Sequence, residues 1–239
     1  MRKLLFLLFT ALATVAILNC SSADDDMPCL SCQYDSYSYR PSSSSSSYPS
    51  SSSRPMSSSS EYTGYTGGSC NASDYGAVEI GNQVWMAKNW GCYAPGSKCY
   101  NNDPAYCNEY GRLYDWATAM SVCPTGWHVP NNDEWDELVN YIESYWGCSG
   151  CAGRYLKAIS GWNSGGNGVD KFGFAALPGG YGGSDGSFYG VGYYGYWWSA
   201  SENSADNADY RDVLYYNENV HRDYDDKSDN LLSVRCLQD

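Results

Sequence analysis

Residues 123–142 read CPTGWHVPNNDEWDELVNYI, and this stretch locates the start of a helix. Asn131 is a good N-cap, and Glu134, three residues later, completes a capping box. Asp133 and Glu134 fall in the first turn, where the helix dipole favours negative charge. The apolar residues that follow recur at helical spacing and form one stripe: Trp135, Leu138, Val139 and Ile142. We therefore predict an amphipathic helix that begins after Pro130.

Short strands and one further helix are predicted around that segment. Residues 77–80 and 83–87 flank Gly81-Asn82, the signature of a two-residue β-hairpin. Apolar residues at helical spacing predict a short helix over residues 112–120. Later strands are expected at 196–200, 213–216, 220–223 and 231–237, the middle two as a hairpin. Together these elements predict an α+β fold with two helices, short antiparallel strands and long loops.

The N-terminus has the pattern of a bacterial lipoprotein signal. Arg2 and Lys3 precede an apolar stretch, residues 4–18, which is shorter than the roughly 20 residues that a membrane-spanning helix needs. The segment Ile17-Leu18-Asn19-Cys20 resembles a lipobox, so we expect Cys20 to carry the lipid. The alternative is an ordinary signal peptide that is cut after a small-x-small site.

The composition divides the chain into three segments. We expect a signal peptide over residues 1–19, a lipidated N-terminus and serine-rich tether over 20–69, and one folded domain over 70–239. Apart from tyrosine, residues 33–69 have almost nothing apolar to bury, so they cannot offset their own ordering entropy. From Cys70 onward, Trp, Tyr and Gly dominate, and this length suits one disulfide-stapled domain.

The chain is strongly acidic, and this limits its partners. Its net charge is −13, and loss of residues 1–19 removes two positive charges and leaves −15. This acidic balance argues against binding of nucleic acid or an anionic membrane through a basic face. We expect the lipid to provide the membrane contact. Ser21 and Asp24-Asp25-Asp26 resemble outer-membrane sorting signals, which favours the outer membrane and its surface. The oligomeric state is left open.

Ten cysteines remain when Cys20 is set aside, an even number that indicates disulfides in an exported chain. The predicted pairs are Cys70–Cys92, Cys99–Cys107, Cys123–Cys236 and Cys148–Cys151. Cys29 and Cys32 form a second Cys-x-x-Cys pair. Zinc binding and redox chemistry are the alternatives for these two motifs, but zinc usually requires paired knuckles in one small fold. A redox motif normally opens a helix, whereas Cys148 follows one.

Several segments, read in order, resemble one family. They are IGNQVWMA at 80–87, YGRLYDW at 110–116, CPTGWHVP at 123–130, GWN at 161–163, FAALPGG at 174–180, YWWSASE at 196–202 and SVRC at 233–236. In this order they resemble the Fibrobacter succinogenes major paralogous domain, over nearly all of residues 74–239. The resemblance implies a lineage rich in secreted paralogues, and it brings no established activity.

A looser resemblance concerns the fold. The block at 127–135 and the late Arg235-Cys236 resemble the C-type-lectin-like fold as used in formylglycine-generating enzymes, which implies a C-type-lectin-like single domain. The catalytic cysteine pair of that enzyme branch has no counterpart here. The Glu-Pro-Asn, Gln-Pro-Asp and Trp-Asn-Asp calcium motifs of sugar-binding lectins are also absent. Neither activity is therefore carried over to particular residues.

Three groups of residues are candidates for chemistry, and each has a simpler structural interpretation. Ser184 lies in a Gly-x-Ser-x-Gly sequence, but the glycine and tyrosine around it favour a turn over a nucleophile elbow. His128 is expected to be a hydrogen-bonded structural residue, and His221 has no second histidine at metal spacing. Four aspartates offer oxygen ligands for calcium: Asp223, Asp225, Asp226 and Asp229. They lack a closing glutamate, so we expect a solvated acidic turn, with no catalytic residue, metal or cofactor.

Eight aromatic residues fall within positions 181–198 amid glycines. Aromatic rings stack on sugars and make good contacts with proteins. Trp197 and Trp198 are expected in the core. The predicted contact surface is therefore made of the tyrosines in the glycine loops: Tyr181, Tyr189, Tyr193 and Tyr194.

Three functions follow as hypotheses. The first is a non-catalytic binding or adhesion module for polysaccharide or a cell-envelope protein, which the tether and the tyrosines favour. The second is an enzyme, either a hydrolase or a relative of the formylglycine-generating branch, which requires converging acids or free cysteines. The third is an inert structural envelope protein. We favour the binding module, with its ligand undetermined.

Overall fold

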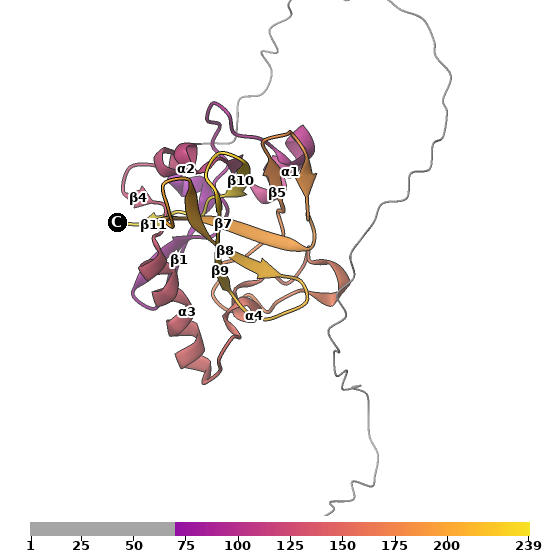
Figure 1. Cartoon of the computed structure of the whole chain (residues 1–239). Helices are drawn as coiled ribbons and strands as arrows, with labels where there is room; N and C mark the ends of the chain where they lie inside the picture. The colour runs from indigo at the N-terminus through magenta and orange to yellow at the C-terminus, as the bar shows by residue number, and fades with distance from the viewer. Residues whose placement is uncertain (1–69) are drawn as a thin grey trace, which may run out of the picture. The chain divides into compact units, whose positions relative to one another are not determined.

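The N-terminal hairpin forms where the sequence predicts it. Strands β1 (Ala77–Ile80) and β2 (Gln83–Met86) pair antiparallel around Gly81-Asn82. Gly81 has a φ of +63°, a left-handed conformation that glycine adopts without steric cost. The computed structural model describes residues 70–239, which Figure 1 shows in colour.

A four-stranded sheet brings the C-terminal residues onto this hairpin. Its order is β1–β2–β11–β4, where β11 (Leu237–Gln238) lies between β2 and β4 (Trp127–His128). Leu237 is opposite Trp85 on one side and His128 on the other. Strands that are distant in sequence therefore fix the hairpin in place.

A larger sheet has the order β6–β5–β10–β7–β8–β9, with β3 also paired to β10. Its strands are β3 (Leu113–Tyr114), β5 (Tyr181–Gly183), β6 (Phe188–Tyr189), β7 (Tyr194–Glu202), β8 (Asn207–Leu214), β9 (His221–Asp226) and β10 (Asn230–Ser233). The pairing of β10 with β7 is parallel, and the other ladders are antiparallel. The predicted strand at 196–200 lies inside β7. The predicted late hairpin joins β8 and β9, which extend further from the turn than predicted.

The predicted last strand, 231–237, is instead two strands in two sheets. β10 belongs to the larger sheet and β11 to the smaller one, and the chain crosses between them at residues 234–236. The crossing is held by backbone bonds: Trp90 N donates to Val234 O at 2.8 Å, and Met86 N to Cys236 O at 3.0 Å. One extended segment therefore links both sheets.

Helix α3 (Asn132–Trp146) begins as the sequence predicts. The Asn131 side chain accepts a bond from Glu134 N at 3.1 Å, and the Glu134 carboxylate accepts one from Asn131 N at 2.8 Å. These two bonds are the reciprocal capping box. Three apolar residues of the predicted stripe are buried, Trp135, Leu138 and Ile142.

The helix predicted over 112–120 begins later, as α2 (Trp116–Val122). Leu113 and Tyr114 belong to β3, because β10 supplies a strand partner for them. Asp115 then caps the helix by accepting a bond from Thr118 N at 2.8 Å. Helical spacing alone could not reveal this competing pairing.

The described residues contain four α-helices, where the sequence predicts two. The additional helices are α1 (Pro104–Tyr110) and α4 (Ala152–Leu156). α1 has a recognisable start, since Asp103 caps it and Pro104 occupies its first position. α4, with five residues, is too short for the i to i+7 spacing that identifies an amphipathic helix, and only Tyr110 of α1 is buried. Three short 3-10 helices, Ala72–Tyr75, Tyr100–Asn102 and Asn163–Gly165, complete the description.

Two main clusters of buried residues form the core. One packs α3 against residues of both sheets and includes Trp85, Trp135, Phe174 and Trp197. The other lies near α2 and includes Met86, Trp90, Tyr114 and Trp198. In Figure 1, α3 lies to one side of β7, β8 and β9, and α1 lies with β5 at another end of the domain.

The structure joins the same four cysteine pairs that the sequence predicts: Cys70–Cys92, Cys99–Cys107, Cys123–Cys236 and Cys148–Cys151. Cys20, Cys29 and Cys32 lie outside the described residues, as do the predicted signal peptide and tether. Among residues 70–239, no helix has both the length and the apolar character needed to cross a membrane.

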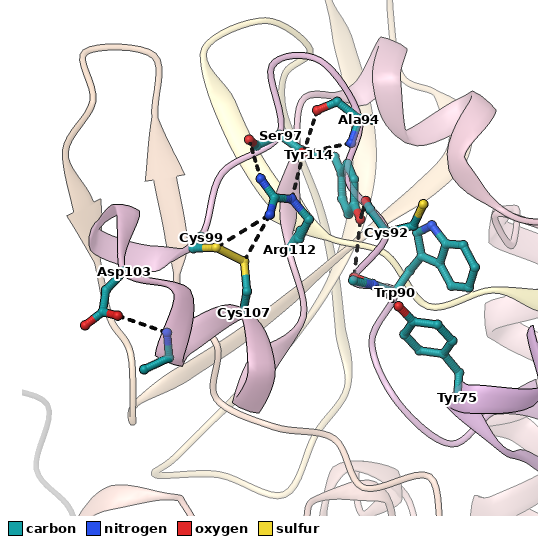
Figure 2. Close-up of a disulfide and its surroundings, with 12 residues drawn as sticks. Tyr75, Trp90, Cys92, Ala94, Ser97, Cys99, Asp103, Cys107, Arg112 and Tyr114 are labelled. Carbon is teal, nitrogen blue, oxygen red and sulfur yellow. Dashed lines mark hydrogen bonds between the residues drawn. A yellow bond between two sulfur atoms is a disulfide. The ribbon is translucent and has the colours of Figure 1, made fainter. Parts of the chain in front are cut away.

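Figure 2 shows how Arg112 packs against the Cys99–Cys107 disulfide. Its Nη1 lies 3.6 Å from the Cys99 sulfur and 3.5 Å from the Cys107 sulfur. The same guanidinium donates to the Ser97 hydroxyl at 2.8 Å and to the Ser97 carbonyl at 3.0 Å. Arg112 therefore ties the loop at Ser97 to helix α1.

Candidate functional site: a tyrosine face on the larger sheet

Successive side chains of β7 point to opposite faces of the larger sheet. Trp197 is buried in the core on the face that α3 covers. Tyr194 and Tyr196 project from the other face and are half-buried. Trp198 shares that other face but is fully buried, because Trp116 of α2 packs in the same cluster. One end of this face is thus covered by α2, and tyrosines occupy the other end.

β8 and β9 continue the same face. Tyr196 pairs with Asp212, Asp212 pairs with His221, and Tyr210 pairs with Asp223. Side chains that are directly opposite each other in a ladder point to the same side of the sheet. Tyrosine rings and carboxylates are therefore neighbours on one surface.

A connected series of rings, which we call the tyrosine face, begins on this surface and continues past the start of β7, where Tyr215 packs against the core cluster of α3. Its members are Tyr181, Tyr189, Tyr193, Tyr194, Tyr196, Tyr210 and Tyr215. Neighbouring ring centroids in the series are 5.2–6.4 Å apart. Contacts in this range are favourable between aromatic side chains and keep the rings in fixed relative positions.

The four tyrosines predicted from the sequence all belong to the tyrosine face. Tyr189 is 47% exposed and Tyr193 is 40% exposed, whereas Tyr181 and Tyr194 are half-buried. The rings are not coplanar: Tyr181 and Tyr189 are inclined by 32°, and Tyr193 and Tyr194 by 50°. Tyr189 and Tyr193 are thus the more accessible contact residues.

Sequence reasoning missed two central members of the face, Tyr196 and Tyr210. The sequence predicts a strand at 196–200 and leaves Tyr196 out of the contact surface, although the order Tyr194-Gly195-Tyr196-Trp197 alternates between two faces. That alternation was an available signal for an outward-facing Tyr196. Tyr210 has no such signal, because only the β7–β8 register brings it beside Tyr196.

Two hollows adjoin on this surface. The first has a volume of about 250 Å³ and is lined by Tyr181, Tyr196, Tyr210, Asp225, Asn230 and Leu232. The second is about 460 Å³ and shares Tyr196 and Tyr210 with the first. Its polar lining includes Asp212, His221, Arg222 and Asp223. The two shared tyrosines therefore stand between two shallow depressions, each with at least one carboxylate in its lining.

Burial and nearby carboxylates keep the tyrosine hydroxyls protonated. Burial raises the pKa of Tyr196, and Asp212 raises it further. Burial also raises the pKa of Tyr210, with added effects from Asp223 and Asp212. For Asp212 itself, burial raises the pKa, while the His221 ring 3.1 Å away opposes that rise. The surface can thus offer neutral hydroxyl donors beside negative acceptors.

Comparison with protein families identifies the domain. The profile of the Fibrobacter succinogenes major domain matches residues 78–238, from β1 to β11. The chain belongs to this family. Among the curated proteins and the solved structures there is no significant match. The tyrosine face lies wholly within the matched Fibrobacter succinogenes major domain.

Ser184 of this family member lies in a hairpin turn. β5 and β6 flank it, whereas a nucleophile elbow lies between a strand and a helix. The Ser184 hydroxyl is 3.3 Å from an oxygen of Asp229, and both residues are exposed. The turn interpretation of Ser184 is confirmed.

Both histidines bond to carboxylates. His128 contacts Asp239 at 2.7 Å through Nδ1 and Glu134 at 2.9 Å through Nε2. Partial burial lowers the pKa of His128, but the bonds to Asp239 and Glu134 outweigh it and leave the pKa raised. His221 contacts Asp212. His128 therefore connects β4, α3 and the C-terminus, as expected of a structural residue.

The acidic residues are not confined to the loop that the sequence predicts. Asp223, Asp225 and Asp226 belong to strand β9, and Asp229 lies in the following turn. The Asp226 carboxylate accepts bonds from the backbone of Ser228 and Asp229, at 2.8 and 3.1 Å, which stabilises that turn. Within residues 70–239, no group of three or more His, Cys, Asp or Glu side chains is arranged to hold a metal ion.

Proposed function

We propose that this chain is a non-catalytic binding module that contacts polysaccharide through its tyrosine face. The observation that carries the proposal is the connected series of rings, in which Tyr189 and Tyr193 are exposed and Tyr196 is central. Aromatic faces stack against the apolar faces of sugar rings, and adjacent hydroxyls and carboxylates supply directional hydrogen bonds.

The chemistry around this face favours binding over catalysis. All eight cysteines of residues 70–239 are in disulfides, so a thiol nucleophile is not favoured there. Ser184 lies in an exposed hairpin turn, away from the strand-to-helix geometry that activates serine. A surface of contacting rings beside shallow depressions suits an extended ligand. Small-molecule substrates are usually bound in deeper, more enclosed pockets.

The proposal includes a location at the cell envelope. A lipid on Cys20 would hold the chain at the outer membrane, and the serine-rich residues 33–69 would separate the domain from the lipid. The even number of remaining cysteines and the disulfides of the domain support an oxidising compartment. Replacement of Cys20 by serine should then release the chain from the membrane fraction.

We also propose that the α+β fold is C-type-lectin-like in its finer arrangement. Support comes from the segments that carry the resemblance: residues 127–135 form β4 and the start of α3, and Arg235-Cys236 lies between β10 and β11. Superposition of an experimental structure on C-type-lectin-like domains tests this, and a different strand order would refute it.

Retention on insoluble polysaccharide tests the binding function. The full exported chain with Cys20→Ser is mixed with cellulose and other insoluble glycans, and a glycan array extends the survey. We expect retention that falls at least tenfold for the double variant Tyr189→Ala, Tyr193→Ala, because two exposed contact rings are removed.

The matched control is Tyr145→Ala, since Tyr145 is 65% exposed on α3 and lies outside the tyrosine face. This variant should be retained like the original chain. No retention on any glycan, together with an empty array, would contradict the proposal and favour an inert structural role.

A further inference from the structure

The smaller hollow of the tyrosine face is lined by rings at steep angles to each other. Tyr196 stands against Tyr181 at 83° and against Tyr210 at 81°, with centroids 5.4 and 5.5 Å apart. Leu232, which is almost fully buried, also lines this hollow of about 250 Å³. Three rings on different strands, β5, β7 and β8, therefore line one recess, whose exposed lining is more polar than apolar.

Negative charge lies at the edge of this recess. Asp225 is half-buried and lines the hollow together with Asn230. Burial is the main cause of the raised pKa of Tyr181 and Tyr210, and the Asp225 carboxylate makes a smaller contribution to both. Asp223 lies opposite Tyr210 on the same side of the sheet. The recess thus has a carboxylate in its lining, and within residues 70–239 no group of three or more side chains is arranged there to hold a metal ion.

The basic residues of β9 and the adjacent turn are occupied elsewhere. Arg222 lies 3.5 Å from Asp136 of α3, on the opposite side of the sheet. Lys227 donates to Glu202 at 2.8 Å and lies over the Trp116 ring. The His221 ring contacts Asp212. None of these three side chains is among the residues that line the recess.

We propose that this recess is an aromatic cage for a quaternary ammonium group. A quaternary cation lacks N–H donors and is weakly hydrated, so it is stabilised by ring faces together with a nearby carboxylate. This inference depends on the proposed function in one respect: the cage and the polysaccharide contact are both assigned to the tyrosine face.

Titration calorimetry with small probes tests the cage. Choline is the cation, and 3,3-dimethylbutan-1-ol is its uncharged analogue of the same shape. We expect saturable choline binding to the full chain with Cys20→Ser, and at least about tenfold weaker binding of the alcohol, because only choline has a charge for the rings and Asp225. Equal affinity for the two probes, or no choline binding, overturns the proposal.

Variants separate the cage from general folding effects. Tyr210→Leu removes one wall and should weaken choline binding at least about tenfold, whereas Tyr210→Phe keeps the ring and should bind within about twofold of the original. Asp225→Asn keeps the shape and should weaken binding severalfold. Tyr145→Leu, which changes an exposed residue on α3, is the control and should leave binding unchanged. A Tyr210→Leu chain that unfolds at the normal urea midpoint and binds choline normally overturns the proposal.

The glycan and choline experiments have separate outcomes. Glycan retention without choline binding refutes the cage and leaves the polysaccharide module standing. Choline binding without retention on any glycan supports the cage and refutes the polysaccharide proposal.

Discussion

Arg235 is a fully buried cation, and its partners are chiefly neutral oxygens. Its guanidinium donates to the Asn89 side-chain oxygen at 2.7 Å and to the carbonyl of Met86 at 3.0 Å, and it also bonds to the Phe174 carbonyl. The Trp197 indole donates to the same Asn89 oxygen at 2.8 Å. Burial lowers the pKa of Arg235 to about 9, which still leaves it charged at neutral pH. This residue therefore links segments that the sequence separates widely.

The raised pKa of His128 predicts how the free energy of unfolding depends on pH. In the folded protein the pKa of His128 is raised above its unfolded value of about 6.5. The ion pairs of the charged ring therefore stabilise the fold fully at pH values below about 6.5. This contribution is lost as the pH rises through the folded pKa. We expect His128→Gln to lower the free energy of unfolding at pH 5.5 and to have a smaller effect at pH 8.5. Urea unfolding at both values measures this. A loss that is equal at the two values contradicts the role assigned to the charged ring.

At the scale of elements, local signals predicted structure well where no distant strand competes. The Gly81-Asn82 hairpin and the capping box of α3 are encoded within a few neighbouring residues and form as expected. Leu113 fits a helical spacing equally well, but β10 pairs with it instead. The last strand is split for the same reason, because residues 234–236 cross between two sheets.

The cap of α3 gives a quantitative prediction. Asn131→Ala removes the bond to Glu134 N and should lower the free energy of unfolding by about 1 kcal/mol, whereas Asn131→Asp keeps an acceptor and should be nearly neutral. Asn203→Ala, in the exposed loop between β7 and β8, is the control. Urea unfolding measures all three. An Ala variant as stable as the Asp variant contradicts the importance of the cap.

At the scale of the whole molecule, the disulfides should differ in their effect on stability. Cys123–Cys236 spans 113 residues, whereas Cys148–Cys151 spans three. On chain-entropy grounds, replacing the first pair by alanine should cost about 4–5 kcal/mol and replacing the second about 2 kcal/mol. Thermal and urea unfolding of the two double variants test the order. Equal losses would contradict an entropic origin of the difference.

The tyrosine face is assembled from several strands that are distant in sequence, so the sequence predicts only part of it. Composition pointed to the glycine loops, and Tyr181, Tyr189, Tyr193 and Tyr194 do lie together. Tyr210 comes from β8, a strand whose position beside β7 only the fold determines. The acidic residues of β9 were predicted as an isolated turn, because nothing local indicates that Asp223 lies opposite Tyr210.

The most direct test of the tyrosine face is an NMR titration with tyrosine ring positions labelled with carbon-13. A soluble oligosaccharide of a retained glycan is added to the full chain with Cys20→Ser. The account predicts that ring signals of Tyr189, Tyr193 and Tyr196 shift with saturation while those of Tyr141 and Tyr145 on α3 stay in place. Saturable shifts confined to the α3 tyrosines, with the tyrosine face unaffected, would contradict it.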